Sequence, residues 1–149
     1  MKDYAQLAFH LRDNFLIKFL RARNLDVQRA ADMFKTAMEW RKERDLDGLL
    51  NQNFTKWEKL FPFIISGFDK QNGPVYYILA STYDIRKAVI AGHYNTLELL
   101  FDRSFELAVR TAVQIYETTG QNEGMALTLI LDLTGFNVRQ HACAACESL

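Results

Sequence analysis

The residue types that could catalyse a reaction or bind a metal are few in this sequence and widely spaced. The three histidines, His10, His93 and His141, form no HExxH pattern, in which two histidines on one helix face hold zinc. Cys143 and Cys146 form a CxxC, but no second pair completes a zinc site and no preceding strand and loop indicates a redox motif. The glycines match neither GxxxxGK[ST] nor GxGxxG. We therefore expect a protein that is not an enzyme and has no metal site and no cofactor.

Three cations, Lys18, Arg21 and Arg23, lie close together near the start of the sequence. Such a cluster is typical of a solvated helix face. Its functional interpretation is the capture of an anionic head group or of a membrane surface. Spacing alone leaves both interpretations open.

Length and composition set the class of protein. The 149 residues amount to roughly one domain. Hydrophobic residues make up 49% of the chain and include 11 phenylalanines, which excludes a disordered protein. No apolar stretch approaches the ~20 residues of a membrane-spanning helix, and no secretory signal is visible. Because 18 basic and 18 acidic residues balance, nucleic acid is not an expected partner. We expect a soluble intracellular protein.

The charges divide the chain into two parts of opposite sign. Residues 1–61 carry 12 basic and 9 acidic side chains, whereas residues 62–149 carry 6 and 9. The charged first part also has helical patterns and the second is more apolar. This predicts a helical region over 1–61, a second region over 62–149, and a boundary near Phe61–Pro62.

Helical periodicity dominates the first region. Asp13 or Asn14 is suited to cap a helix that ends near Asn24. Asp26 is suited to cap a second helix, which runs to Arg44 with apolar residues on one stripe. Shorter helices are expected before Asp13 and over 51–60, so that the region forms a small bundle.

Strand patterns begin after Pro62. The ranges 63–68 and 74–80 are apolar and rich in β-formers, and the polar loop DKQNG between them predicts a hairpin. A long helix is expected from Thr96 to Gly120. The segment MALTLILDL at 125–133 has no polar face, which is typical of a strand buried on both faces of an α/β sheet. A further helix is expected to start within 138–148.

Three segments together resemble the CRAL-TRIO family. The stretch FLIKFLRARNLDVQRAADMFKTAMEWRKERD is similar to the family's helical N-terminal lobe. GFDKQNGPVYY resembles its "DKxGRPV" hairpin, and LILDLTGF its "DLxG" strand end. They occur in the family's order over residues 13–136. The resemblance implies an α/β fold, in which a small N-terminal helical bundle precedes a lipid-binding lobe.

The resemblance also implies a function. Family members hold one hydrophobic molecule, such as a phosphoinositide, tocopherol or retinoid, in an apolar cavity, and some transfer it between membranes. The candidate lining residues are Tyr77, Leu79, Leu127, Leu129 and Leu131, although each also suits an ordinary core. Lys18, Arg21 and Arg23 are the candidates for contact with a head group or with membrane anions.

Two departures from the family pattern favour a less polar ligand. The basic pair that approaches the inositol phosphate in some members is Arg23–Asn24 here, so one cation is replaced by an amide. Leu127 and Leu129 stand where hydroxyl side chains face the phosphatidylcholine head group in other members. Leucine offers no hydrogen bond to a phosphate.

The family's lipid-binding lobe continues beyond its "DLxG" strand with further helices, strands and a gate helix. We therefore expect that 62–149 is a partial lobe and that this sequence leaves an apolar strand and a helix face exposed to water. We expect a monomer in the cytoplasm that contacts membranes peripherally. The alternative function is a protein-interaction or targeting module of a signalling regulator, such as a small-GTPase regulator or a phosphatase.

Overall fold

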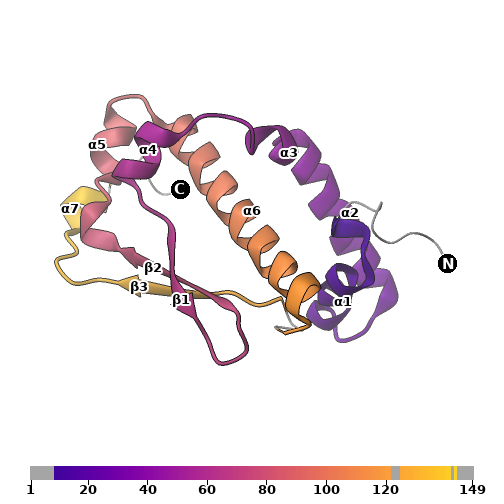
Figure 1. Cartoon of the computed structure of the whole chain (residues 1–149). Coiled ribbons are helices and arrows are strands. Elements are labelled where there is room, and N and C mark those ends of the chain that lie inside the picture. The colour runs from indigo at the N-terminus through magenta and orange to yellow at the C-terminus, as the bar shows by residue number, and fades with distance from the viewer. Residues whose placement is uncertain (1–8, 122–124, 142, 144–149) are drawn as a thin grey trace.

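The structure is a computed structural model that describes residues 9–121, 125–141 and 143 (Figure 1). A 3-10 turn, Phe9–Leu11, precedes the N-terminal helices α1 (Asp13–Ala22), α2 (Val27–Glu43), α3 (Leu46–Leu49) and α4 (Thr55–Leu60). The rest comprises β1 (Ile64–Phe68), β2 (Pro74–Leu79), a 3-10 turn (Ala80–Thr82), α5 (Ile85–Ile90), α6 (Tyr94–Thr119), β3 (Thr128–Asp132) and α7 (Val138–His141). The predicted α/β class, with helices first, is confirmed.

A tight turn joins α1 to α2. Asn24 and Leu25 both adopt left-handed backbone conformations, with φ of 52° and 65°, which reverses the chain directly after α1. Asp26 caps α2 as predicted, because its carboxylate accepts a hydrogen bond of 3.0 Å from the Arg29 backbone amide. The predicted cap of α1 is wrong: its N-cap residue is Arg12, whose side chain makes no capping hydrogen bond.

The predicted hairpin and third strand are confirmed as a three-stranded mixed sheet with the order β1-β2-β3. β1 pairs antiparallel to β2, and β2 pairs parallel to β3. The loop between β1 and β2 is held by Asp69, whose Oδ1 accepts hydrogen bonds of 2.8 Å from the amides of Gln71 and Gly73. Asn72 supplies the positive φ of 64° that the reversal needs.

The long helix α6 lies between the sheet and the helices α1, α2 and α3, whereas α4 lies beside α5 (Figure 1). Its buried side is apolar, and Leu97, Leu100, Ala108 and Ala112 are all 0% exposed. It begins at Tyr94, two residues before the predicted cap Thr96, and ends as predicted at Gly120, whose φ is 69°. In the described part of the chain, no helix is long and apolar enough to cross a membrane.

One core cluster includes residues from both parts of the sequence. Leu46, Leu49 and Phe54 of the N-terminal region pack in the same cluster as Ile78 of β2 and Leu97 of α6. Because both ranges contribute to one core cluster, the division into domains 1–61 and 62–149 stays a prediction from charge and composition. The structure joins the two ranges through α6.

The prediction that β3 is buried on both faces is wrong for this chain. β3 is an edge strand, and its residues Leu129, Ile130 and Leu131 are 43%, 46% and 54% exposed. The reason is that α6 packs against β2, so that the helix layer does not extend over the neighbouring strand. The exposure agrees with the other expectation, that an apolar strand is left in contact with water.

We predict that Leu97→Ala lowers the free energy of unfolding by about 2–5 kcal/mol, because it opens a cavity under α6. Urea unfolding followed by circular dichroism measures the change. The matched control is Leu25→Ala, since Leu25 is 66% exposed and loses little packing. An equal effect of the two variants would contradict the position of α6 in the core.

Candidate functional site

Aromatic side chains gather between α6 and the sheet face that is turned toward it, called the inner face below. Tyr76 and Ile78 of β2 lie on this face and are 5% and 9% exposed. Phe63 stacks on Tyr76 with ring centroids 4.6 Å apart, and it meets Phe105 of α6 at 5.3 Å. These contacts make an aromatic wall that bridges the two layers.

A cavity of about 280 Å³, called the sheet cavity below, adjoins this wall. Its other lining residues include Phe101 of α6 and Leu131 of β3. Two hydroxyl groups line it and both are satisfied within the protein. Tyr83 donates to the Pro62 carbonyl, and Ser104 donates to the Leu100 carbonyl at 2.8 Å.

The electrostatic consequence is a neutral lining. Burial raises the pKa of Tyr83 to about 12, so its hydroxyl stays protonated at any physiological pH. The sheet cavity therefore has the character of a site for hydrocarbon.

A second cavity, of about 340 Å³, shares Phe63 and Ser104 with the sheet cavity and extends along α6 toward α4. It contains one cation, Arg103, whose side chain is 16% exposed. Arg103 forms an ion pair with Glu58, and its guanidinium lies 5.9 Å from the centre of the Phe54 ring. This is the polar end of an otherwise apolar space.

One donor of Arg103 is unused. Its Nε is buried and has no hydrogen-bond partner among the residues that the structure describes. A buried donor without a partner costs roughly 1–3 kcal/mol. Because Nε is closed off from the cavity surface, a ligand oxygen can accept from it only after the Arg103 side chain turns toward the cavity. The two cavities together can hold an apolar molecule that carries one acceptor.

The five predicted lining residues lie on two sides of the sheet. Leu129 and Leu131 pair with Tyr76 and Ile78, which places them on the inner face. Leu131 lines the sheet cavity. Leu127 precedes β3 and is half-buried.

Tyr77 and Leu79 lie instead on the opposite, outer face of the sheet. They pair with Ile130 and Asp132, one register position away from the inner-face residues. The Tyr77 hydroxyl donates to Asp132, and this bond together with Thr134 lowers the pKa of Asp132 to about 2. Because alternate residues of a strand face opposite ways, one lining set cannot combine Tyr77 with Leu131.

The three predicted cations also separate. Lys18 is half-buried, its Nζ donates to the Met125 carbonyl at 3.0 Å, and burial lowers its pKa. Arg21 and Arg23 are exposed. Lys18 thus lies in a different environment from the other two.

Sequence reasoning missed Arg103 and Glu106, two charged residues of α6 whose side chains are 16% and 4% exposed. A signal for Arg103 exists in the sequence, because it falls at four-residue spacing between Leu99 and Leu107 and so interrupts an apolar stripe. Glu106 falls at the same spacing after Glu98 and Asp102.

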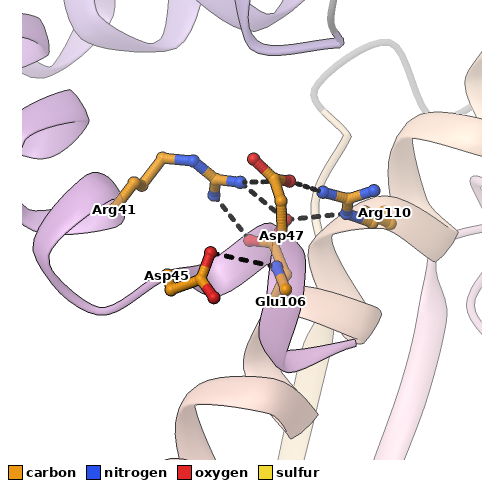
Figure 2. A network of polar contacts seen from close by, with 6 residues as sticks. Arg41, Asp45, Asp47, Glu106 and Arg110 are labelled. Carbon is orange, nitrogen blue, oxygen red and sulfur yellow. Dashed lines mark hydrogen bonds and ion pairs between the residues drawn. The ribbon is translucent and has the colours of Figure 1, made fainter. Parts of the chain in front are cut away.

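Glu106 is the centre of the polar network in Figure 2. Its carboxylate is 4% exposed and accepts two hydrogen bonds from Arg41 of α2, of 2.6 and 2.9 Å. Arg110 donates a third from its Nε, of 2.7 Å. Asp47 bridges the two arginines. Next to it, the carboxylate of Asp45 caps α3 by accepting from the backbone amide of Gly48.

Two further ion pairs lie beside this network. Arg44, the residue that caps the end of α2, reaches Asp102 at 2.7 Å and Glu98 at 3.0 Å. The basic residues at the end of α2 therefore bind α6 as well as suiting the C-terminus of their own helix. Together the pairs attach the N-terminal helices to α6.

The arginines control the protonation of Glu106. Burial alone would raise the pKa of its carboxyl group, but the hydrogen bonds and positive charges of Arg41 and Arg110 outweigh burial and lower it. Glu106 is therefore ionised at neutral pH and compensated on both sides.

The residues named at the outset for metal or redox chemistry lie elsewhere. His93 packs edge-on against Trp57 at 4.8 Å, and Cys143 packs against the main core. Cys146 lies outside the described residues. Within the described ranges no three His, Cys, Asp or Glu residues come together as a metal site would require.

Comparison with known proteins gives two kinds of match. The model of the CRAL/TRIO N-terminal domain matches residues 4–36. The chain is 34% identical over 73 residues to "Protein real-time" of Anopheles gambiae, which covers 48% of this chain and 11% of that protein.

Plant relatives match similarly. Patellin-4 of Arabidopsis thaliana is 35% identical over 65 residues, 44% of this chain and 12% of that protein. Patellin-2 of the same plant is 40% identical over 67 residues, 44% of this chain and 10% of that protein. The chain thus spans only about a tenth of the length of the curated relatives it matches.

These matches agree with the resemblance seen in the sequence motifs. The start of the chain, residues 4–36, is thus similar to the N-terminal domain of CRAL/TRIO proteins.

We predict that Glu106→Gln lowers the free energy of unfolding at neutral pH by about 3 kcal/mol, because it leaves the buried guanidinium of Arg41 without its counter-charge. The lowered pKa sets the sign of the pH dependence. The contribution of Glu106 is complete above its unfolded value of 4.5 and is lost as pH falls through the lower folded pKa.

Urea unfolding of both proteins at neutral pH and at about pH 3 checks this prediction, and the difference between them should shrink in acid. Glu39→Gln on the exposed side of α2 is the control and should have little effect at either pH. A difference that is constant across this range would show that the charge of Glu106 does not stabilise the fold.

Proposed function

We propose that this chain binds an apolar lipid between the inner face of the sheet and α6, as part of a protein that carries or transfers such lipids. The observation that supports this most is the pair of adjoining cavities with aromatic walls and one buried donor, Arg103 Nε. The similarity of residues 4–36 to the CRAL/TRIO N-terminal domain supports the same class of ligand.

The lining favours a ligand with a hydrocarbon body and a single oxygen acceptor, such as a tocopherol-like or retinoid-like molecule. The cavities measure about 280 and 340 Å³, and small-molecule sites occupy roughly 300–1,000 Å³. A phosphoinositide is the less favoured ligand, because Arg103 is already paired with Glu58 and Leu129 offers no hydrogen bond.

Membrane contact is the second part of the proposal. Arg21 and Arg23 are exposed at the end of α1, where each basic side chain near an anionic membrane contributes about 1 kcal/mol. We infer that they meet a membrane while a monomeric cytoplasmic protein takes up or releases its lipid.

The alternative is a protein-interaction module, and the outer face of the sheet supports it. Ile64 and Ile130 are 63% and 46% exposed there, beside the half-exposed Tyr77. Exposed apolar side chains that lie together on a sheet suit a protein partner. A chain that binds no lipid but captures a protein through this face would favour the alternative.

We predict that Leu131→Asp abolishes lipid binding, because it places a charge in the lining of the sheet cavity. Native mass spectrometry after exposure to cell lipid extract measures the loss of the bound lipid. Ile130→Asp is the matched control, since it is the neighbouring residue of the same edge strand, is similarly exposed, and faces the other side.

Leu131→Asp and Ile130→Asp each place a carboxylate in the same edge strand, so the two variants differ mainly in which face of the sheet carries the charge. Lipid retained by Leu131→Asp, or lost equally from Ile130→Asp, would contradict binding on the inner face. Absence of any lipid from the unaltered chain would contradict the carrier function itself.

We predict that Arg103→Met weakens the binding of retinol by about tenfold and leaves the binding of a hydrocarbon of the same size unchanged, because a hydrogen bond to a charged donor is worth roughly 1.5–3 kcal/mol. Fluorescence titration measures both affinities. Glu58→Gln is the control, because it removes the ion pair of Arg103 and keeps the guanidinium. An equal loss in the two variants would assign the effect to the ion pair.

A further inference from the structure

A groove separate from the sheet cavity lies on the other side of α6, between that helix and the helices α1 and α2. It has a volume of about 610 Å³, which is more than twice that of the sheet cavity. Its walls are mainly apolar, with Phe15 and Phe19 from α1, Met33 and Met38 from α2, and Val109 from α6. Methionine side chains adapt to the shape of a flexible occupant.

Four charged residues, Lys18, Arg41, Asp102 and Glu106, also line this groove. Three of them are compensated by one another or by residues beside them. Arg41 binds Glu106 in a two-bond pair, and Asp102 binds Arg44. The charges of Arg41, Glu106 and Asp102 are therefore balanced within the protein.

Lys18 is different. Its ammonium group has three N–H donors, and the described partners are the Met125 carbonyl at 3.0 Å and the face of the Phe15 ring at 5.7 Å. Within the described ranges no carboxylate lies within ion-pair distance of it. The groove therefore combines an apolar trough with a single, half-buried and uncompensated positive charge.

We propose that this groove is a second binding site, which takes a long-chain fatty acid with its carboxylate on Lys18. A single negative charge neutralises the single cation, whereas a doubly charged phosphate would remain half uncompensated beside Asp102 and Glu106. The acyl chain lies along Phe19, Met33 and Ala37 and replaces water on these side chains.

This site does not rest on the function proposed for the sheet cavity. Helix α6 separates the two, although Phe105 lines both. A ligand in the groove contacts α1 and α2, which contribute no lining to the sheet cavity. The two sites are therefore testable with different variants.

The experiment is a fluorescence titration of the full chain with cis-parinaric acid and with its methyl ester. Lys18→Gln is expected to weaken binding of the acid by about tenfold or more and to leave binding of the ester unchanged, because a charge-assisted contact is lost only for the acid. Lys35→Gln removes an exposed lysine of α2 that does not line the groove; it is the matched control and leaves both affinities unchanged.

A steric variant tests the path of the acyl chain without altering any charge. Ala37→Trp fills the groove and is expected to prevent binding of both acid and ester. Ala31→Trp lies on the same helix, is exposed outside the groove, and is expected to bind both. Circular dichroism confirms that each variant is folded.

The proposal would be overturned if the unaltered chain did not bind the acid, or if Ala37→Trp still bound it. It would also be overturned if Lys18→Gln bound the acid as tightly as the unaltered protein. Loss of acid binding in Leu131→Asp, with binding intact in Lys18→Gln, would assign the acid to the sheet cavity instead. Failure of the function proposed for the sheet cavity leaves this result unaffected.

Discussion

The buried carboxylate of Glu106 is the constraint on which the arrangement of this protein depends. A carboxylate that is 4% exposed is stable only if positive charge surrounds it, and the arginines that do so come from two places. Arg110 belongs to the same helix, but Arg41 comes from α2, far away in the sequence. Satisfying Glu106 therefore positions the N-terminal helices on α6, and the ion pairs of Arg44 with Asp102 and Glu98 reinforce that position.

Once the N-terminal helices are attached in this way, α6 becomes a wall between two apolar spaces. Its face with Phe101 and Ser104 closes the sheet cavity, and its face with Asp102 and Val109 closes the groove beside α1 and α2. Each space has one basic side chain with hydrogen-bonding capacity left over. For the sheet cavity it is Arg103, whose Nε lies in the adjoining cavity, and for the groove it is Lys18. A single helix thus borders both of the sites proposed for an apolar molecule with one polar end.

Local patterns predicted most of the elements correctly. The Asp26 cap, the α2 stripe, the Gly120 helix end and the hairpin around Asn72 depend on neighbouring residues, and such signals are readable from a sequence. The lining residues were predicted less well. Alternate residues were grouped without a register, and the pairing of Tyr77 with Ile130 and of Leu131 with Ile78 separates them onto opposite faces. Pairing register is a property of two strands together.

The sequence by itself indicated the CRAL-TRIO resemblance, the order of the helices and strands and the apolar composition of the chain, because these follow from residue types and short spacings. Only the tertiary structure decided which side chains share a space. From the sequence, Arg103 cannot be distinguished from an exposed basic residue of a helix, but in the fold its neighbours bury it. Lys18 and Arg21 are likewise equivalent in sequence, but in the folded α1 Lys18 is half-buried and Arg21 is exposed. Burial and pairing are set by contacts between residues up to about a hundred positions apart, as between Lys18 and Met125, and these contacts exist only in the folded chain.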